Sequence, residues 1–511
     1  MSFETAPRQA AAGPSETAAA TAPQPRRLRW SPWRLIPPLD ADPRIVAFVT
    51  SWRGRALLVI AFGLLLIPSQ GRLALPLAVA AAACAYAGAY RRGLVVLATL
   101  VFLYHDPSWY PSLTAIAAAK AGLTQAIDLR AIERGMLVLF LLAALGTLYA
   151  VRRFRTLPPC RRPILSLHLA FAACLLLAAA MQPRNLGAVL WWSWVGTFAA
   201  YFWFLCYAVL DQTAKRLNPL PLQLGAFHPF WGSSTTPIGK GWAYLRRVEA
   251  RDARELAVTQ LKGLKLLLWS LLLWLLLLGF RGAAFRLLRI PDFDAAFTAQ
   301  LGGVPYPWYL CWASLVCGFL QDLLTISIWG HTIVACARLA GFRLLRNTYR
   351  PLESRTVAEF WNRYYFYFKE LLVEVFFYPT FMRCFRRHPR LRLAFATFMA
   401  AGVGNMIWHY MRDIRAIIDV GLAQSVIGFQ TFAFYALVLA TGIAVSQAIP
   451  RKDKAGTGWL RRQFLPCLRV AAFYCLLHVF DDEGRAHTLP QHLAFLLHLF
   501  GLNPFGAGAW I

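Results

Sequence analysis

Long stretches without Asp, Glu, Lys or Arg recur along the whole chain, and most of them approach the length of a membrane-spanning helix. Such a helix needs about 20 mostly apolar residues, and Lys or Arg at its ends can extend to the interface when the run is shorter. The pattern therefore predicts an all-α, polytopic integral membrane protein with about ten to twelve transmembrane helices. The runs are 56–71, 73–90, 135–151, 163–183, 185–210, 266–280, 295–321, 323–337, 393–411, 421–450 and 486–511.

Composition agrees with this pattern, and the charge adds a second feature. The chain is 58% hydrophobic and 15% charged, and its net charge of +29 comes from 53 basic and 24 acidic residues. Short cytoplasmic loops of membrane proteins collect Lys and Arg, which explains most of this excess. Attraction of an anionic substrate or of anionic lipid head groups is a second explanation. Nucleic acid is not an expected partner, because the basic residues are scattered between the apolar runs.

The ten cysteines are spread singly, and most lie in apolar runs, where cysteine behaves as a small hydrophobic residue. Because no two of them have the spacing of metal ligands, the sequence predicts neither a disulfide framework nor a metal site.

The chain divides into a short tail and a long membrane domain. Residues 1–50 begin with a segment rich in Ala, Pro and Thr and contain no apolar core of a signal peptide, so we expect a disordered, basic tail in the cytoplasm. Residues 51–511 form the predicted multi-pass domain, and 341–413 is its most informative segment.

The longest polar insertion covers residues 217–265. Its first part is rich in Gly, Pro and Ser and predicts a loop, whereas its second part predicts an amphipathic helix on the cytoplasmic surface. His228 lies in the loop-like part. Since loop histidines usually meet only water or backbone, we assign it no function.

His409 is an ionisable residue near the end of an otherwise uncharged run, where such groups are costly and usually face protein or a wet cavity. On a helix, Asn405, His409 and Asp413 would share one face. The carboxylate could then orient the imidazole and leave it able to act as a general base. A purely structural histidine, with Asp413 paired to a neighbouring arginine, fits the same spacing.

The segment 359–370 upstream is aromatic on every face, which is typical of a helix at an interface or beside a pocket. Arg355, Arg363 and Lys369 could bind the phosphates of a donor. They could equally be interfacial anchors beside an aromatic belt.

Several short motifs occur in a recognisable order. They are Gly341-Phe342, then Asn347-Thr-Tyr-Arg-Pro351, then Glu359-Phe-Trp-Asn-Arg-Tyr-Tyr365, then Phe377-Tyr-Pro-Thr380, and finally Ile407-Trp-His-Tyr410. This order resembles the membrane-bound O-acyltransferase (MBOAT) superfamily, in particular its bacterial alginate-O-acetylation-like branch. Members there carry Gly-Phe, Asn-x-x-x-Pro, Glu-Phe-Trp-x-Arg-Trp-His, Tyr-x-Pro-Leu and Leu-Trp-His-Gly. The resemblance covers about 70 residues.

The resemblance implies catalytic positions as well as a fold. The characteristic histidine of the family corresponds to His409, and its second polar position corresponds to Tyr365, where many relatives have His or Asn. A tyrosine is a weak base near pH 7, although it can orient an acceptor or an oxyanion. Asn362 is an alternative for this role, and Asn405 is a further candidate. Tyr410 replaces the glycine that usually follows the histidine.

The reaction that the resemblance implies is transfer of an acyl group, with acetyl as the expected group in this branch, from acyl-CoA or another thioester to a hydroxyl. The implied acceptor is an envelope glycan, a lipid-linked sugar or another hydroxyl compound, in the bacterial inner membrane, with envelope-modification proteins as partners. We expect no bound cofactor. The alternative is a catalytically inactive relative that acts as a transporter or scaffold. An ion-coupled transporter ranks last, because Asp322 is the one acidic residue deep within an apolar region.

Overall fold

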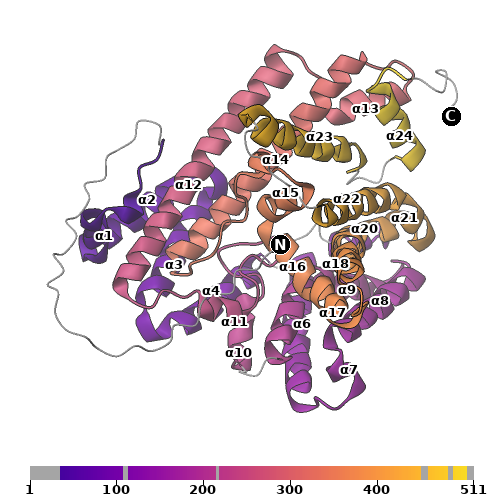
Figure 1. Ribbon diagram of the computed structural model, residues 1–511. Coiled ribbons are helices and arrows are strands. Elements are labelled where there is room, and N and C mark those ends of the chain that lie inside the picture. Colours follow the sequence, from indigo (N-terminus) through magenta and orange to yellow (C-terminus); the bar gives the residue numbers. More distant parts are fainter. Residues whose placement is uncertain (1–34, 107–112, 214–217, 450–457, 482–486, 503–511) are drawn as a thin grey trace. The chain divides into compact units, whose positions relative to one another are not determined.

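The protein is built from helices joined by loops, as the computed structural model shows for residues 35–106, 113–213, 218–449, 458–481 and 487–502 (Figure 1). Within these ranges the β pairing consists of one isolated antiparallel bridge, between Glu249 and Phe342. The α-helices are α1 (Pro43–Thr50), α2 (Trp52–Gln70), α3 (Ala74–Tyr86), α4 (Arg91–His105), α5 (Leu113–Lys120), α6 (Leu129–Arg153), α7 (Pro158–Arg161), α8 (Pro163–Met181), α9 (Leu186–Thr213), α10 (Leu220–Gln223), α11 (Trp242–Arg247), α12 (Ala253–Arg281), α13 (Phe293–Leu301), α14 (Trp308–Leu339), α15 (Val357–Tyr364), α16 (Phe366–Leu372), α17 (Tyr378–Arg383), α18 (Pro389–Phe398), α19 (Asn405–Arg412), α20 (Arg415–Val420), α21 (Leu422–Gly428), α22 (Gln430–Ala448), α23 (Leu465–Leu477) and α24 (Leu489–His498).

Nine helical stretches in the described part of the chain are long and apolar enough to cross a membrane. They make the chain an all-α, multi-pass membrane protein. The stretch in α9 is 72% buried, whereas the other eight are 22–44% buried, so α9 is the innermost of them. The nine are Trp52–Tyr86, Leu129–Arg153, Pro163–Met181, Leu186–Thr213, Ala253–Leu287, Trp308–Leu339, Pro389–Arg412, Gln430–Ala448 and Leu460–Phe480.

This number is below the predicted ten to twelve, for reasons that concern individual elements. The runs 295–321 and 323–337 are not two spans, because α14 continues through Asp322 as one helix of 32 residues. The run 421–450 is divided between α21 and α22, and the final run contributes α24, whose 10 residues are too short to span. Conversely, the stretch Trp52–Tyr86 contains two helices, α2 and α3, that pack against each other as a hairpin.

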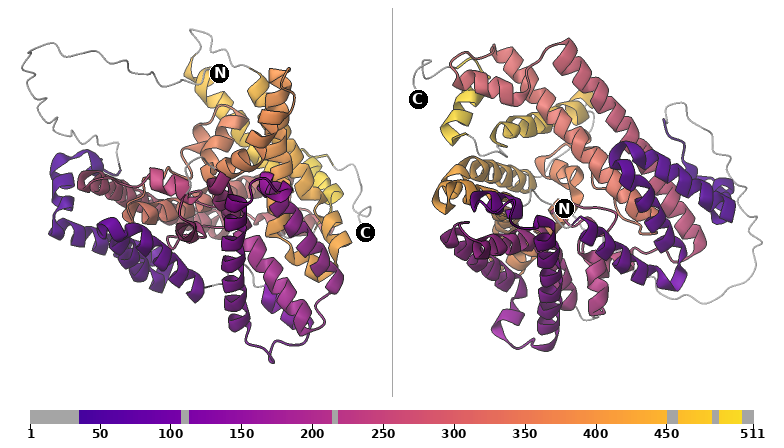
Figure 2. Two further views of the ribbon diagram at one scale, coloured as in Figure 1. Left: turned by 90° about the horizontal axis from the view of Figure 1, so that it is seen from below. Right: turned by 180° about the vertical axis from the view of Figure 1, so that it is seen from behind.

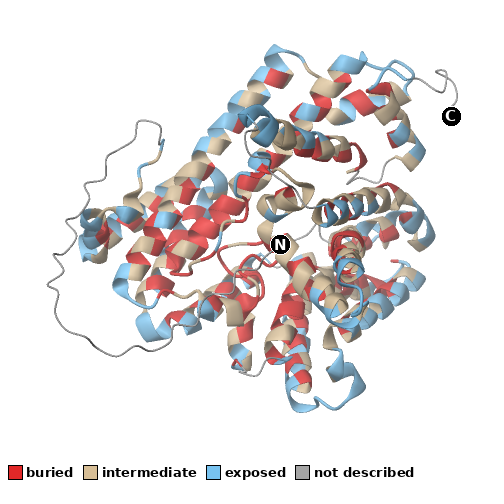
Figure 3. Ribbon diagram, viewed as in Figure 1, coloured by how far each residue is buried: buried red, intermediate tan, exposed pale blue. Residues whose placement is uncertain are grey.

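Three clusters of buried apolar side chains hold the helices together. The first centres on α6, α8 and α9, and the second on α2, α3, α12 and the C-terminal half of α14. The third joins the N-terminal half of α14 with α13, α15, α22, α23 and α24. The helices α12 and α14 lie side by side in the views of Figures 1 and 2. Peripheral elements such as α7 are exposed (Figure 3).

All three clusters meet at the segment that follows Glu359. Phe360 belongs to the third cluster, Tyr367 to the second and Phe368 to the first. This segment therefore lies at the junction of the three clusters, where a small local change would be felt by each of them.

The N-terminal part of the chain becomes helical before the boundary at residue 50 that the sequence suggested. A 3-10 turn (Leu39–Ala41) and α1 precede this boundary, and both contact α12. Lys265 on α12 forms an ion pair with Asp40, whose Oδ1 lies 2.6 Å from Nζ. Residues 1–34 of the predicted tail lie outside the described residues.

The polar insertion at 217–265 differs most from its prediction. Its first part is a loop, as predicted, but the loop lies inside the protein, because 227–231 and 235–239 are buried without a break. Its second part is not one amphipathic surface helix. The short α11 is followed by an extended stretch that pairs with the segment after α14, and α12 then begins as a spanning helix. The polar residues that suggested a surface element instead supply hydrogen bonds inside the protein.

Candidate functional site

The predicted aromatic helix 359–370 is broken at Tyr365, which separates α15 from α16. The backbone of Tyr365 is extended (φ −138°, ψ 77°), so the helical hydrogen bonds stop on one side of it and restart on the other. A break of this kind exposes backbone groups that need partners when they are buried.

Two residues of the Asn-x-x-x-Pro motif supply these partners. The Asn347 carbonyl oxygen accepts from the Phe366 N–H at 2.8 Å, and its side chain accepts from the Tyr367 N–H at 3.3 Å. The Thr348 hydroxyl donates to the Tyr364 carbonyl oxygen at 2.8 Å. The motif therefore fixes the break, and with it the direction of the Tyr365 side chain.

Two π-helical segments pack against each other next to this break. One (Val373–Phe377) follows α16 and the other (Met399–Gly404) precedes α19. A Cβ atom at Gly404 would lie only 2.5 Å from Cδ2 of Phe376. Glycine at this position thus permits the close approach that sets α19, and its His409, beside α16. Single turns of π-helix are frequent at functional sites.

His409 lies on α19, is half-buried and is surrounded by aromatic rings. Its ring centroid lies 4.0 Å from that of Phe432, 4.6 Å from that of Trp408 and 6.2 Å from that of Phe368. The ring of Phe368 is in turn 5.7 Å from that of Tyr365. Phe368 is therefore a shared neighbour of the two residues that correspond to the polar positions of the motif.

Asn405 and His409 lie one turn apart on α19, as the predicted helical face requires, whereas Asp413 lies just beyond the helix. Asn405 is 1% exposed, and its Oδ1 has no hydrogen-bond partner among the described residues. The Trp408 Nε1 is buried and lacks a described partner in the same way. Asp413 is the cap residue after α19, where the backbone leaves the helical conformation (φ −119°, ψ 36°). The last turn thus ends just at the predicted carboxylate.

The Tyr365 hydroxyl faces polar groups. It lies 3.1 Å from the Ser234 hydroxyl, which comes from the buried part of the polar insertion. Burial raises the pKa of Tyr365, and the hydrogen bond to Ser234 and the charge of Arg412 counteract this only in part. The phenol is therefore protonated near neutral pH and can donate a hydrogen bond. Arg412 also lies over the Trp408 ring, at 5.8 Å.

The remaining predicted site residues have exposed surroundings or charged partners. Asn362 is exposed on α15. The proposed phosphate-binding cations lie beside carboxylates: Arg363 pairs with Glu359 at 2.5 Å, and Lys369 pairs with Glu370. The Arg355 backbone N–H also donates to Glu359, at 2.8 Å. Among the described residues, no group of three or more His, Cys, Asp and Glu side chains could hold a metal ion.

The buried loop that carries Ser234 is anchored at several points. Phe230 donates its N–H to the Thr99 hydroxyl on α4 at 3.2 Å, and Ile238 donates to the Ser233 hydroxyl at 3.0 Å. At its far end Lys240 contacts two carboxylates, Glu370 at 2.5 Å and Glu374 at 3.4 Å. A non-helical backbone at membrane depth needs such internal partners.

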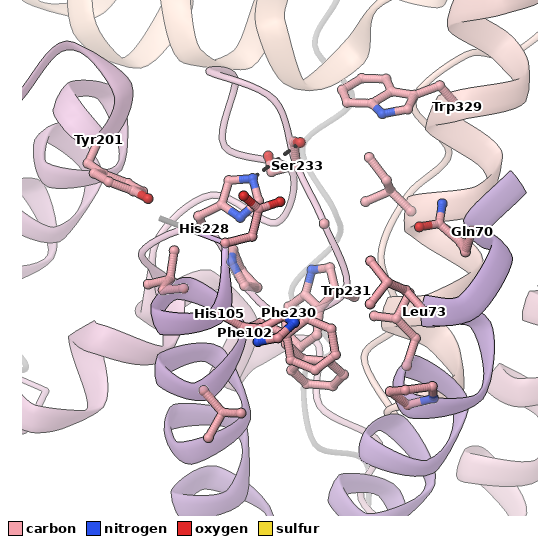
Figure 4. Close-up of a pocket in the computed structure, with 18 residues that line it drawn as sticks. Gln70, Leu73, Phe102, His105, Tyr201, His228, Phe230, Trp231, Ser233 and Trp329 are labelled. Atoms are coloured by element: carbon pink, nitrogen blue, oxygen red, sulfur yellow. Dashed lines mark hydrogen bonds between the residues drawn. The ribbon is translucent and has the colours of Figure 1, made fainter. Parts of the chain in front are cut away.

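A cavity of ≈ 320 Å³ adjoins this loop (Figure 4). Its wall includes residues 228–233 of the loop, Tyr201 from α9 and Trp329 from α14. The Trp329 ring centroid is 6.2 Å from that of Tyr365, so this part of the cavity wall is close to the helix break. His409 is not among its lining residues.

His228, to which we assigned no function from the sequence, is part of the cavity wall. It is 8% exposed and has a left-handed backbone (φ 52°) that is uncommon outside glycine. Its Nε2 lies 3.3 Å from the Ser233 carbonyl oxygen, which can only accept, so Nε2 carries the proton in this contact (Figure 4). Burial lowers the pKa of His228 to about 4, so its ring is neutral near pH 7.

We expect the shifted pKa of His228 to make the fold sensitive to mild acid. Between about pH 6.5 and pH 4 the unfolded chain binds a proton at this residue and the folded protein does not, so stability is full above this window and falls as the pH decreases through it. The shift corresponds to roughly 3 kcal/mol. In His228→Asn, whose side chain tolerates the left-handed backbone, this part of the pH dependence should be absent.

Thermal unfolding of the two proteins in the same detergent, from pH 7 to pH 4, measures this difference. The loss of Tm on acidification should be larger for wild type than for the variant. His105→Gln, which changes an exposed histidine at the same cavity, serves as the control. Equal losses in wild type and His228→Asn would contradict the prediction.

Sequence reasoning did not identify His228, Ser234 or Arg412 as parts of this region. One signal was present for the loop: the Phe, Trp and Ile residues at 227–238 are more apolar than a surface loop requires. No protein-family model matches the chain, and no curated protein matches it.

Proposed function

We propose that the protein is a membrane-embedded O-acyltransferase that moves an acyl group, acetyl in the first place, from a thioester such as acyl-CoA to a hydroxyl. The acceptor is an envelope glycan, a lipid-linked sugar or a similar compound. One observation supports this most directly: the Tyr365 and His409 rings share Phe368 as a neighbour, with centroids 5.7 Å and 6.2 Å from the Phe368 centroid. The MBOAT resemblance supplies the reaction class.

In this proposal His409 is the general base. It takes the proton of the acceptor hydroxyl while the hydroxyl oxygen bonds to the thioester carbonyl carbon. The carbon–sulfur bond then breaks and the ester is released. The proton passes from His409 to the leaving sulfur, which departs as a free thiol. The Tyr365 hydroxyl, supported by Ser234, donates to the carbonyl oxygen as it becomes negative, and Arg412 contributes a positive charge nearby.

Asn405 has a positioning role in this scheme. It lies one helical turn before His409, and its buried Oδ1 is unpaired within the described residues. An acceptor with a second hydroxyl would satisfy this atom on binding. Asp413 is the cap residue directly after α19, and in this proposal its carboxylate is the candidate for orienting the imidazole.

The proposed location is the bacterial inner membrane, with the N-terminus in the cytoplasm. Arg91 and Arg92 at the start of α4 and Arg152 and Arg153 at the end of α6 then lie on the cytoplasmic side. A polyanionic thioester donor would approach from this basic side. Partner proteins of envelope modification would receive or deliver the acceptor.

The proposal is tested with purified protein in lipid nanodiscs and radiolabelled acetyl-CoA, with a labelled long-chain acyl-CoA in parallel. We expect time-dependent release of free CoA thiol and appearance of label in an ester, with acetyl-CoA as the better donor. Folded protein that consumes neither thioester in the presence of a bacterial membrane extract would contradict the proposal.

A catalytically inactive relative, acting as a transporter or scaffold, is the second candidate. It is favoured by the close packing of the His409 ring on Phe432, with centroids 4.0 Å apart, and by the fact that His409 does not line the cavity described above. It predicts no thioester consumption and no effect of His409 substitutions on whatever activity the protein has.

A further inference from the structure

We propose that the cavity beside the buried loop is the binding pocket for the acceptor, and that the acceptor is an amphiphile: a lipid-linked molecule with a hydroxyl-bearing head group. This inference rests on the proposed acyl transfer for its biological meaning, but the binding itself does not depend on that activity. At ≈ 320 Å³ the cavity has the size of a small-molecule site.

The inner end of the cavity is suited to a hydroxylated group. His228 is neutral near pH 7, and Trp231 is 2% exposed. Gln70, which also lines the cavity, has a side-chain amide that can donate hydrogen bonds to hydroxyl groups and accept them. The aromatic faces of Trp231, Phe230 and Phe102 offer flat surfaces for the apolar face of a sugar ring (Figure 4).

The mouth of the cavity has a different character from its inner end. Leu73, at the turn between α2 and α3, is 39% exposed, and Val101 on α4 is 56% exposed. Pro76 extends this apolar rim, whereas His105 and Asp106 form a polar and exposed side. An apolar rim beside polar side chains is the arrangement expected where a lipid tail leaves a pocket while its head group stays inside.

The position of the mouth agrees with an entry from the outer leaflet. Helix α4 starts at Arg91 and Arg92 and ends at His105, so the mouth lies at the end of α4 opposite to these arginines. The positive-inside rule then places it at the outer face. Trp329 in the cavity wall has its ring centroid 6.2 Å from that of Tyr365, so a head group bound against Trp329 would lie near the proposed reaction site.

The test uses a photoreactive alkyl glucoside, with the crosslinker in its alkyl chain, added to the full-length protein in nanodiscs. Crosslinked peptides are identified by mass spectrometry, and unlabelled octyl glucoside or free glucose competes. We expect crosslinks on the peptides that carry Leu73 and Val101, with competition by octyl glucoside and not by an equal concentration of glucose. If glucose competed as strongly as octyl glucoside, the claim that the ligand is an amphiphile would be wrong. Crosslinks confined to other helices would contradict the claim that this cavity is the binding pocket.

A matched pair of variants on α4 makes the test specific. Val101→Trp places a large side chain in the mouth, whereas Leu97→Trp places the same side chain one turn away, at a residue that is 57% exposed and does not line the cavity. Crosslinking should fall on the order of tenfold in Val101→Trp, because the bulky ring blocks a small site, and should not change in Leu97→Trp. Equal yields in both variants would overturn the proposal.

Thioester consumption is measured on the same samples. Crosslinking at the mouth without any thioester consumption would contradict the proposed acyl transfer and would still support the proposed pocket. If Val101→Trp consumed the thioester normally and formed the ester of octyl glucoside normally, the proposed acyl transfer would be supported and the proposed pocket would be contradicted.

Discussion

Replacing His409 by alanine is expected to lower acyl transfer by about 10²–10⁴-fold, which is the usual contribution of a positioned general base. The half-buried ring is in contact with Phe432, Trp408 and Phe368, so its removal also costs some packing. His409→Gln keeps a polar side chain of similar size but cannot take a proton at neutral pH. Both variants should therefore lose activity to a similar degree, while His409→Gln should unfold closer to the wild-type temperature.

The control for this experiment is His388→Ala, which removes an exposed histidine in the loop between α17 and α18. Its transfer rate should equal that of wild type. A His409→Gln protein that folds normally and transfers label at the wild-type rate would exclude this residue as the base.

The second large effect concerns the stability of the buried loop. Lys240 is 11% exposed in its side chain and bridges Glu370 and Glu374, and its own backbone is left-handed (φ 56°). Lys240→Met would leave Glu370 with Lys369 as its ion-pair partner. Breaking a buried pair on one side typically costs about 3–5 kcal/mol, and we expect the lower end of this range because Lys369 remains. The free energy of unfolding in detergent measures the loss.

Charge effects give this second prediction a pH signature. Burial alone would lower the pKa of Lys240, but the charges of Glu370 and Glu374 outweigh burial and raise this pKa. Burial alone would raise the pKa of Glu370, but the charges of Lys240 and Lys369 outweigh burial and lower this pKa. The stabilisation is therefore lost as the pH falls through the lowered pKa of Glu370, and also as it rises through the raised pKa of Lys240. Arg415→Met, which breaks the exposed pair with Asp419, is the control and should cost at most about 1 kcal/mol. Equal losses in the two variants would contradict a special role for Lys240.

The sequence predicted those features that depend on local periodicity. The helix that carries Asn405 and His409, the apolar stretches and the membrane class follow from runs of side chains that need no distant partner. The resemblance also selected the segments around Tyr365 and His409, which the fold joins through Phe368 although more than forty residues separate them in the chain.

Other features depend on distant partners and could not be predicted in this way. Asp322 suggested a boundary between two spans, yet α14 continues through this residue. The charged side chain has a partner in the protein, because its Oδ2 lies 3.7 Å from Nδ1 of His478 on the neighbouring helical stretch. The break at Tyr365 depends on Asn347 and Thr348, whose hydrogen bonds replace those of a continuous helix. The Gly, Pro and Ser content around His228 predicted a loop but not its burial, which depends on polar groups that satisfy one another inside the protein.

A double-mutant cycle with Tyr365→Phe and His409→Ala, measured as the rate of label transfer from acetyl-CoA, tests the central claim most directly. If the two residues serve one reaction site, the double variant should be little slower than His409→Ala alone, because groups that act as a unit are strongly non-additive. Fully multiplicative losses in the cycle, or transfer that neither substitution slows, would contradict the claim that Tyr365 and His409 form one catalytic site.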